Sequence, residues 1–162
     1  LLRREGMPFT LRSQLAGRSE SFRTGEVLLV DSVGELLRLY AVSDVVFVGG
    51  SLVPTGGHNI LEPASLRVPV LFGPHMSNFR EAAALVLSYG CGMQVQDGEE
   101  LATVLDALLM DSERRRAMGE SGTRLMEENS GSTLLHLDAI AKVLAANSDS
   151  PTLTLPRWER ER

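Results

Sequence analysis

Four short runs of consecutive apolar residues punctuate the first two thirds of the chain, and each is predicted to be a β-strand. They are VLLV at 27–30, VVFVG at 45–49, VPVLF at 68–72 and, more weakly, GMQV at 92–95. None alternates apolar with polar residues, which is typical of strands in a parallel sheet that helices cover on both faces. A further short strand is expected at FTL, 9–11.

The segments between these strands carry apolar residues at helical spacing. These positions are Leu36, Leu37, Tyr40 and Ala41 in one segment, Phe79, Ala82, Ala83 and Val86 in a second, and Leu101, Val104, Leu105 and Leu108 in a third. Strands that alternate with helices connect by right-handed crossovers. The pattern therefore predicts an α/β fold with a Rossmann-like parallel sheet and flanking helices.

Each predicted helix begins with a polar residue that is followed three positions later by a glutamate, the pattern of an N-cap and capping box. The pairs are Ser32 with Glu35, Asn59 with Glu62, Asn78 with Glu81, and Asp97 with Glu100. Because each helix follows a parallel strand, all four N-termini are expected at the carboxyl edge of the sheet, where open α/β sheets bind their ligands.

The remainder of the chain is predicted to be helical up to a polar tail. Residues 111–129 form either one helix or two short ones broken at Gly119 or Gly122, and residues 131–146 form another. The three arginines at 114–116 are interpreted as a solvated helix face, with contact to an anionic surface as the less favoured alternative. One domain is therefore expected over 1–146, followed by a poorly ordered tail over 147–162.

The segment VGGSLVPTGGHNILEPA, 48–64, places four glycines within ten residues directly after a strand. Glycine permits positive φ and a close approach to the main chain, and a helix N-terminus favours a phosphate or carboxylate. The spacing matches neither a P-loop nor a dinucleotide fingerprint. The residues alone indicate either a sugar-phosphate site or an Asn59–Glu62 pair that only caps its own helix. His58 and His75 are each either a ligand donor or a loop-stabilising residue.

Composition and charge exclude several other classes of function. The 162 residues carry a net charge of -5 and no basic face, which argues against nucleic-acid binding. The single cysteine, Cys91, excludes an internal disulfide and is expected to be a buried apolar residue. No apolar run reaches the about 20 residues that span a bilayer. No second histidine or acidic cluster stands at metal-ligand spacing, so no metal site is expected. No cofactor is expected either.

The run FVGGSLVPTGGHNILEPASLRVPVLFGPHMSNFRE, 47–81, with VDSVGELLRLYAVSDVVFVGG leading into it, resembles the donor-binding half of the 3-deoxy-D-manno-octulosonic acid (Kdo) transferases. These enzymes attach Kdo from CMP-Kdo to the lipid A precursor in lipopolysaccharide synthesis. The resemblance extends from about Leu1 to about Leu144. It implies the carboxyl-terminal half of a GT-B glycosyltransferase, which has two Rossmann-like domains facing a cleft.

The same resemblance implies where the donor binds and where the chemistry occurs. The CMP site would be formed by Val33, Gly34 and Glu35 on one side and by Asn59, Ile60, Leu61 and Glu62 on the other. The catalytic base, the acceptor groove and the membrane-contacting helices would belong to an amino-terminal domain that these residues do not contain. No catalytic residue is therefore expected here, and this piece alone is not expected to transfer sugar. The whole enzyme would be inverting and metal-independent, at the cytoplasmic face of the inner membrane of a Gram-negative bacterium.

Two alternatives remain open at this point. One is another GT-B nucleotide-sugar enzyme, either a UDP-sugar transferase or a non-hydrolysing epimerase, because such enzymes also place a glutamate at a helix start to hold ribose. The other is a non-catalytic nucleotide- or carbohydrate-binding module.

Overall fold

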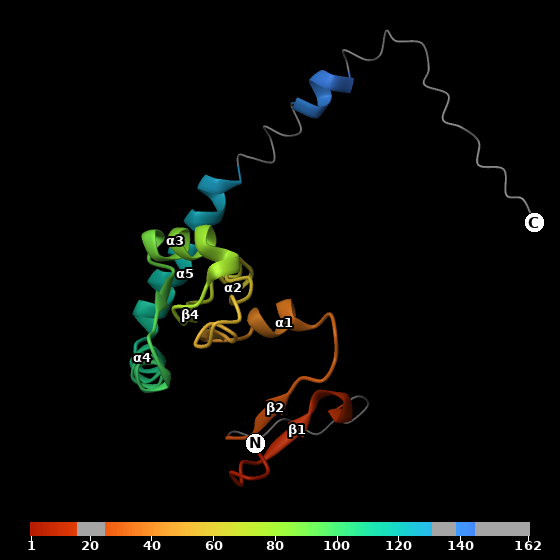
Figure 1. The fold of residues 1–162 in the computed structure, drawn as a ribbon, viewed down its shortest axis with the longest axis vertical. Helices are drawn as coiled ribbons and strands as arrows, with labels where there is room; N and C mark the ends of the chain where they lie inside the picture. The colour runs from red at the N-terminus through yellow and green to blue at the C-terminus, as the bar shows by residue number, and fades with distance from the viewer. Residues whose placement is uncertain (16–24, 131–138, 145–162) are drawn as a thin grey trace, which may run out of the picture.

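The computed structural model describes residues 1–15, 25–130 and 139–144 (Figure 1). The strands are β1 (Phe9–Leu11), β2 (Val27–Leu29), β3 (Val46–Val48), β4 (Val70–Phe72) and β5 (Gly92–Gln94). The α-helices are α1 (Leu36–Tyr40), α2 (Leu61–Ser65), α3 (Arg80–Tyr89), α4 (Gly98–Met110) and α5 (Ser112–Asn129), and two 3-10 turns lie at η1 (Arg12–Leu15) and η2 (Ser77–Phe79). Residues 139–144 are also helical. The predicted tail, 147–162, lies outside the residues that the structure describes.

All five predicted strands are confirmed, and every pairing between them is parallel. They form two sheets, β1-β2 and β3-β4-β5. The α/β class with parallel strands and flanking helices is therefore confirmed. The expectation of a single sheet is wrong for the described residues, because the β1-β2 pair lies apart from the three-stranded sheet (Figure 1).

Helices cover both faces of the three-stranded sheet. Val70 and Phe72 of β4 point into a cluster that includes Ala64 of α2 and Val86 of α3. Leu71, which points to the opposite face, packs with Leu108 of α4 and Met118 of α5. All three β4 side chains are fully buried. This two-sided burial explains why the strands read as uninterrupted apolar runs.

The predicted N-cap of α4 is confirmed, whereas the predicted N-cap of α3 is wrong. Asp97 caps α4 as predicted, with Oδ1 accepting from the amides of Glu99 at 3.0 Å and Glu100 at 2.9 Å. Asn78 does not cap α3, because η2 occupies its position and α3 begins at Arg80 without a side-chain cap. The main-chain amide of Asn78 donates to Gly56 O at 3.2 Å, and its side chain lies against Gly56. A tertiary contact has replaced the local cap.

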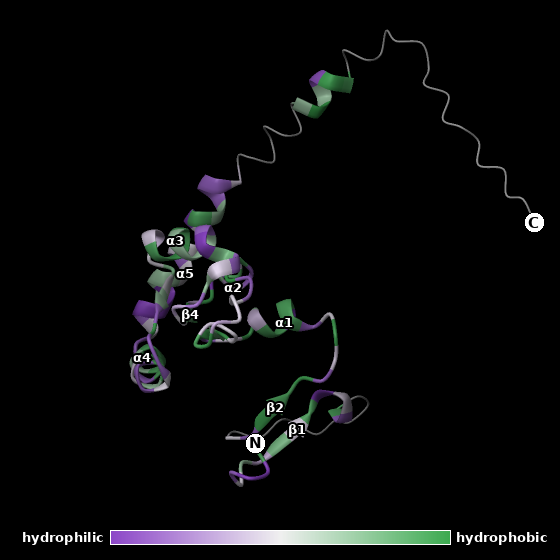
Figure 2. Ribbon diagram, viewed as in Figure 1, coloured by the Kyte–Doolittle hydropathy of each residue, from purple (hydrophilic) through white to green (hydrophobic). Residues whose placement is uncertain are grey.

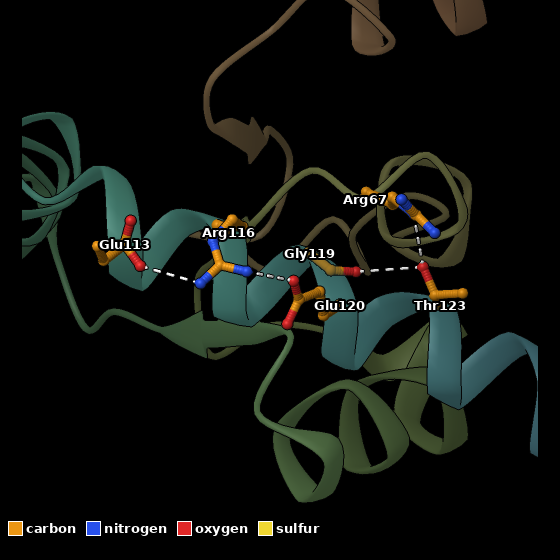
Figure 3. Close-up of polar contacts among 6 residues, drawn as sticks. All are labelled: Arg67, Glu113, Arg116, Gly119, Glu120 and Thr123. Carbon is orange, nitrogen blue, oxygen red and sulfur yellow. Dashed lines mark hydrogen bonds and ion pairs between the residues drawn. The ribbon is translucent and has the colours of Figure 1, made fainter.

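Helix α5 is continuous, so the predicted break at Gly119 or Gly122 is wrong. Both glycines are buried, and each lies against main chain around α2. A Cβ at Gly119 would lie 2.4 Å from Arg67 O, and one at Gly122 would lie 2.4 Å from Ala64 O. Beside them, Arg67 Nε donates to Thr123 Oγ1 at 3.0 Å (Figure 3). The glycines therefore allow close helix packing and do not interrupt the helix.

The arginines at 114–116 serve different purposes. Arg116 is exposed and pairs with Glu113 at 3.0 Å and Glu120 at 2.7 Å, as a solvated helix face should (Figure 3). Arg115 instead donates to the carbonyl oxygens of Leu108 at 2.5 Å and Leu109 at 2.7 Å. It therefore satisfies two carbonyl groups at the end of α4. The solvated-face interpretation is correct for Arg116 but not for Arg115.

Within the described ranges, no helix combines the length and the apolar character that crossing a bilayer requires.

Candidate functional site

The glycine-rich loop after β3 is folded tightly on itself. The amide of Gly57 donates to Gly50 O at 2.9 Å, and Thr55 Oγ1 donates to the same oxygen at 2.6 Å. His58 Nδ1 lies 3.1 Å from Gly49 O. The structure thus supports the loop-stabilising interpretation of His58. It leaves the second ring nitrogen, Nε2, outside this contact.

Two of the glycines allow the loop to pack against the segment that follows β4. Gly56 and Gly57 are buried and have φ values of 97° and 73°, a region that L side chains rarely adopt. A Cβ at Gly56 would lie 2.3 Å from Asn78 Nδ2, and one at Gly57 would lie 2.3 Å from Met76 Sδ. The positive φ favours glycine at both positions, and the absence of a Cβ lets the Asn78 and Met76 side chains approach the loop at the carboxyl edge of the sheet.

Ser51 joins the carboxyl ends of β3 and β4. Its fully buried hydroxyl donates to Val48 O at 2.5 Å and accepts from the amide of Gly73 at 2.8 Å. Its carbonyl oxygen accepts from the amide of His75 at 2.9 Å. Ser51 therefore fixes the relative position of the two loops that follow these strands.

We expect Ser51→Ala to lower the free energy of unfolding by about 1–2 kcal/mol, because it leaves the buried amide of Gly73 without its acceptor. Chemical denaturation monitored by circular dichroism measures this change. Ser88→Ala is the matched control, since the exposed Ser88 hydroxyl donates to Leu85 O in its own helix, at 2.9 Å. Equal effects of the two substitutions would contradict the positioning role of Ser51.

The start of α2 holds one half of the predicted ligand site. Asn59 Oδ1 accepts from the amide of Leu61 at 3.0 Å, and Asn59 Nδ2 donates to Glu62 Oε1 at 3.0 Å. Asn59, Leu61 and Glu62 are half-buried, whereas Ile60 is 0% exposed and belongs to the core. Ile60 could therefore contact a ligand through its main chain but not through its side chain. A carboxylate has about four acceptor positions, so the bond from Asn59 leaves Glu62 with capacity for another donor.

The start of α1 holds the other half. Val33 is 99% exposed, and Gly34 has a φ of 88°. The Glu35 carboxylate accepts from the Ser32 hydroxyl and, at 2.7 Å, from Arg12 Nη2. The hydrogen bond from Ser32 and then that from Arg12 lower the pKa of Glu35 below its ordinary value. Glu35 is thus an anion that already has two partners, and Arg12 is a neighbour that the sequence analysis did not identify.

Helices α1 and α2 are in contact, so the two halves of the predicted site lie on neighbouring elements. Tyr40, at the end of α1, packs against the core cluster that contains Ile60 and Ala64. Burial, followed by the negative charge of Glu62, raises the pKa of the Tyr40 hydroxyl. The Glu62 carboxylate on α2 therefore acts electrostatically on the Tyr40 hydroxyl on α1.

A hollow of about 500 Å³ lies beyond the carboxyl ends of β4 and β5. Its polar lining comes from His75, Ser77, Arg80 and Gln94. Of these residues, His75 was a candidate from the sequence, whereas Arg80 and Gln94 were not. The position of Gln94 near the carboxyl end of the predicted parallel strand 92–95 was the signal that could have identified it.

No group of three histidine, cysteine or acidic side chains is placed to hold a metal ion in the part of the chain that the structure describes. Cys91 is 1% exposed, and burial raises the pKa of its thiol. The thiol lies 3.5 Å from Val86 O. Cys91 is therefore a buried apolar residue, as predicted.

Comparison with known proteins bears directly on these segments. No protein-family model matches the chain. It is 36% identical over 148 residues to the 3-deoxy-D-manno-octulosonic acid transferase of Haemophilus influenzae, a match that covers 91% of this chain and 34% of the relative. It is 34% identical over 139 residues to the enzyme of the same name from Bordetella pertussis, covering 86% of this chain and 32% of the relative. The chain thus spans about a third of the length of these curated relatives.

A solved structure supports the same resemblance. The C-terminal CMP-Kdo binding domain of WaaA from Acinetobacter baumannii matches with a TM-score of 0.69 and 33% sequence identity. The match covers 77% of this chain and 64% of that domain. The resemblance to the carboxyl-terminal domain of Kdo transferases, which are glycosyltransferases, is therefore confirmed.

Proposed function

We propose that this chain is the donor-binding domain of a Kdo transferase and that it binds CMP-Kdo. The observation that carries the proposal is the match in both sequence and fold to a solved domain described as CMP-Kdo binding. The contact between α1 and α2, which brings the two predicted walls onto neighbouring helices, is consistent with it.

Each wall of the proposed site has a distinct chemical task. Amides at the start of α2, around Asn59 and Ile60, suit the CMP phosphate, because the first turn of a helix leaves N–H groups without helical partners. Glu62 is suited to accept hydrogen bonds from the ribose hydroxyls. On the other wall, Val33 and Gly34 offer an exposed apolar side chain and an open main chain.

In this proposal Glu35 positions its loop and does not contact the nucleotide directly, although the resemblance alone places it in the CMP site. Its carboxylate is held by Ser32 and Arg12, so its contribution is to position the 33–35 loop, with direct contact to the nucleotide made by its neighbours. The Arg12 bond ties this loop to η1.

For the whole protein, we propose transfer of Kdo from CMP-Kdo to the lipid A precursor lipid IVA, with inversion and without a metal ion. A base outside these residues would deprotonate an acceptor hydroxyl while CMP leaves. The α2 amides would stabilise the charge on the departing phosphate. The acceptor and the cytoplasmic face of the inner membrane would be engaged mainly by the rest of the enzyme.

Isothermal titration of the domain with CMP and, separately, with UDP tests the donor assignment. We expect CMP to bind at least tenfold more tightly than UDP. Preference for UDP would favour a UDP-sugar enzyme of the same architecture, and binding of neither nucleotide would contradict the donor-binding role.

A further inference from the structure

The segment from Asp31 to Glu35 lies between β2 and α1 and carries one wall of the proposed CMP site. None of the amides from Asp31 to Gly34 donates to a main-chain oxygen of the described residues. In Figure 2 the connection from β2 to α1 shows both hydrophilic and hydrophobic colouring. A segment without main-chain hydrogen bonds is easily displaced unless side chains hold it. The contacts of its side chains therefore decide its shape.

Ser13 of η1 holds the beginning of this segment. Its amide donates to Asp31 Oδ1 at 2.9 Å, and its hydroxyl donates to Asp31 Oδ2 at 2.6 Å. The bond from the Ser13 hydroxyl, followed by that from the Ser13 amide, lowers the pKa of Asp31 below its ordinary value. Asp31 is therefore an anion near neutral pH, and its two oxygens fasten η1 to the chain shortly after β2.

Arg12, the preceding residue of η1, holds the end of the segment. Its Nη2 donates to Glu35 Oε1 at 2.7 Å, and the Arg12 and Glu35 side chains are 34% and 26% exposed. Fully exposed ion pairs contribute little, because water screens them and both side chains must be ordered. Here partial burial reduces the screening, and the hydroxyl of Ser32 orders the same carboxylate. Since Ser13 fastens η1 to the segment, Arg12 reaches Glu35 from a fixed position.

The two residues between these contacts are open to a ligand. Val33 is 99% exposed, and a Cβ at Gly34 would meet nothing within 4 Å. We propose that Arg12 is a positioning residue for nucleotide binding, which holds residues 31–35 in the shape in which Val33 and Gly34 contact CMP. A site already held in its bound shape binds more tightly, because less conformational freedom is lost on binding. This inference rests on the proposed function and assigns Arg12 no contact with the nucleotide.

A direct contact between Arg12 and the CMP phosphate is the alternative role. The carboxylate of Glu35 already neutralises the guanidinium charge, which favours the positioning role. The two roles differ when Arg12 and Glu35 are changed together. A residue that acts through Glu35 has no further effect once that carboxylate is absent, whereas a residue that contacts the nucleotide adds its own effect.

Titration calorimetry of the chain with CMP distinguishes these roles. We expect Arg12→Gln and Glu35→Ala each to weaken CMP binding by about fivefold or more, and the double variant to bind within about twofold of Glu35→Ala alone. Arg12→Lys should bind within about threefold of the parent, because an ammonium can supply the donor that Nη2 supplies to Glu35. Additive losses in the double variant, or parent affinity in Arg12→Gln, would overturn the inference.

Arg116→Gln is the matched control, because Arg116 is exposed and pairs with Glu113 and Glu120 within α5. It should bind CMP within about twofold of the parent. Thermal unfolding of every variant separates positioning from stability. Loss of stability in Arg12→Gln with unchanged CMP affinity would leave Arg12 a structural role alone and overturn the inference. A parent chain that does not bind CMP would contradict the proposed function, and this inference with it.

Nuclear magnetic resonance of the Arg12 side chain tests the inference without any substitution, so the result does not depend on the folding of a variant. Saturation with CMP should shift the amide resonances of Val33 and Gly34 more than the Nε–H resonance of Arg12, because Arg12 keeps its bond to Glu35. A larger shift of the Arg12 resonance would indicate that the nucleotide lies against the guanidinium and would overturn the positioning role.

Discussion

Glu62→Ala in the proposed donor-binding domain is expected to weaken CMP binding by more than tenfold. The half-buried Glu62 carboxylate lies in the first turn of α2, and the bond from Asn59 engages one of its oxygens. A hydrogen bond to a charged group is worth about 1.5–3 kcal/mol. Since 1.4 kcal/mol corresponds to a tenfold change in affinity, loss of one such bond to ribose is sufficient. Titration calorimetry of the variant with CMP measures the change.

The control for Glu62 must separate ligand binding from helix capping. Glu81 is also a glutamate in the first turn of a helix, but it is exposed and belongs to α3. We expect Glu81→Ala to leave CMP affinity within twofold of the parent. Thermal unfolding of both variants reports any loss of capping. A Glu62 variant with reduced stability and unchanged CMP affinity would leave Glu62 with the structural role alone.

The strands could be predicted from the sequence because a strand that is buried on both faces consists of consecutive apolar residues. The three residues of β4 are completely buried, and the run VPVLF shows it. The α4 cap was equally accessible, because Asp97 and the amides it accepts from lie within three residues of each other. Features determined by neighbours in sequence can be predicted from sequence.

The predictions that were wrong concern residues whose contacts are with segments distant in sequence, where a local contact had been expected. Asn78 has the sequence position of a cap but contacts Gly56 across the carboxyl edge. Gly119 and Gly122 were predicted to break the helix because glycine disfavours helices, but they lie against the carbonyl oxygens of Arg67 and Ala64. No local rule distinguishes a glycine that ends a helix from one that allows another main chain to approach.

The candidate site shows the same division. The residues at the start of α2 could be proposed from sequence because the glycine loop and the cap lie beside one another in the chain. The pairing of Glu35 with Arg12 could not, because 23 positions separate them. Likewise, the role of Ser51 depends on the amide of Gly73, which lies 22 positions away, directly after β4.

The packing of α5 against α2 leads to the largest expected effect on stability, from Gly122→Ala. A Cβ at this position would lie 2.4 Å from Ala64 O, and that obstacle is main chain that cannot rotate away. Overpacking of this kind lowers the free energy of unfolding by about 3 kcal/mol. The loss outweighs the gain of about 1 kcal/mol that alanine normally gives over glycine inside a helix. Chemical denaturation of the purified domain measures the net change.

Gly98→Ala is the matched control for the packing argument. Gly98 is the first residue of α4, and an added Cβ there meets nothing within 4 Å. The same chemical change should therefore be neutral or stabilising by up to about 1 kcal/mol. Because the two substitutions share the loss of glycine entropy in the unfolded chain, their difference isolates the contact between α5 and α2. A Gly122→Ala domain as stable as Gly98→Ala would mean that the helices can separate freely, and α5 would not hold α2 in place beneath the proposed donor site.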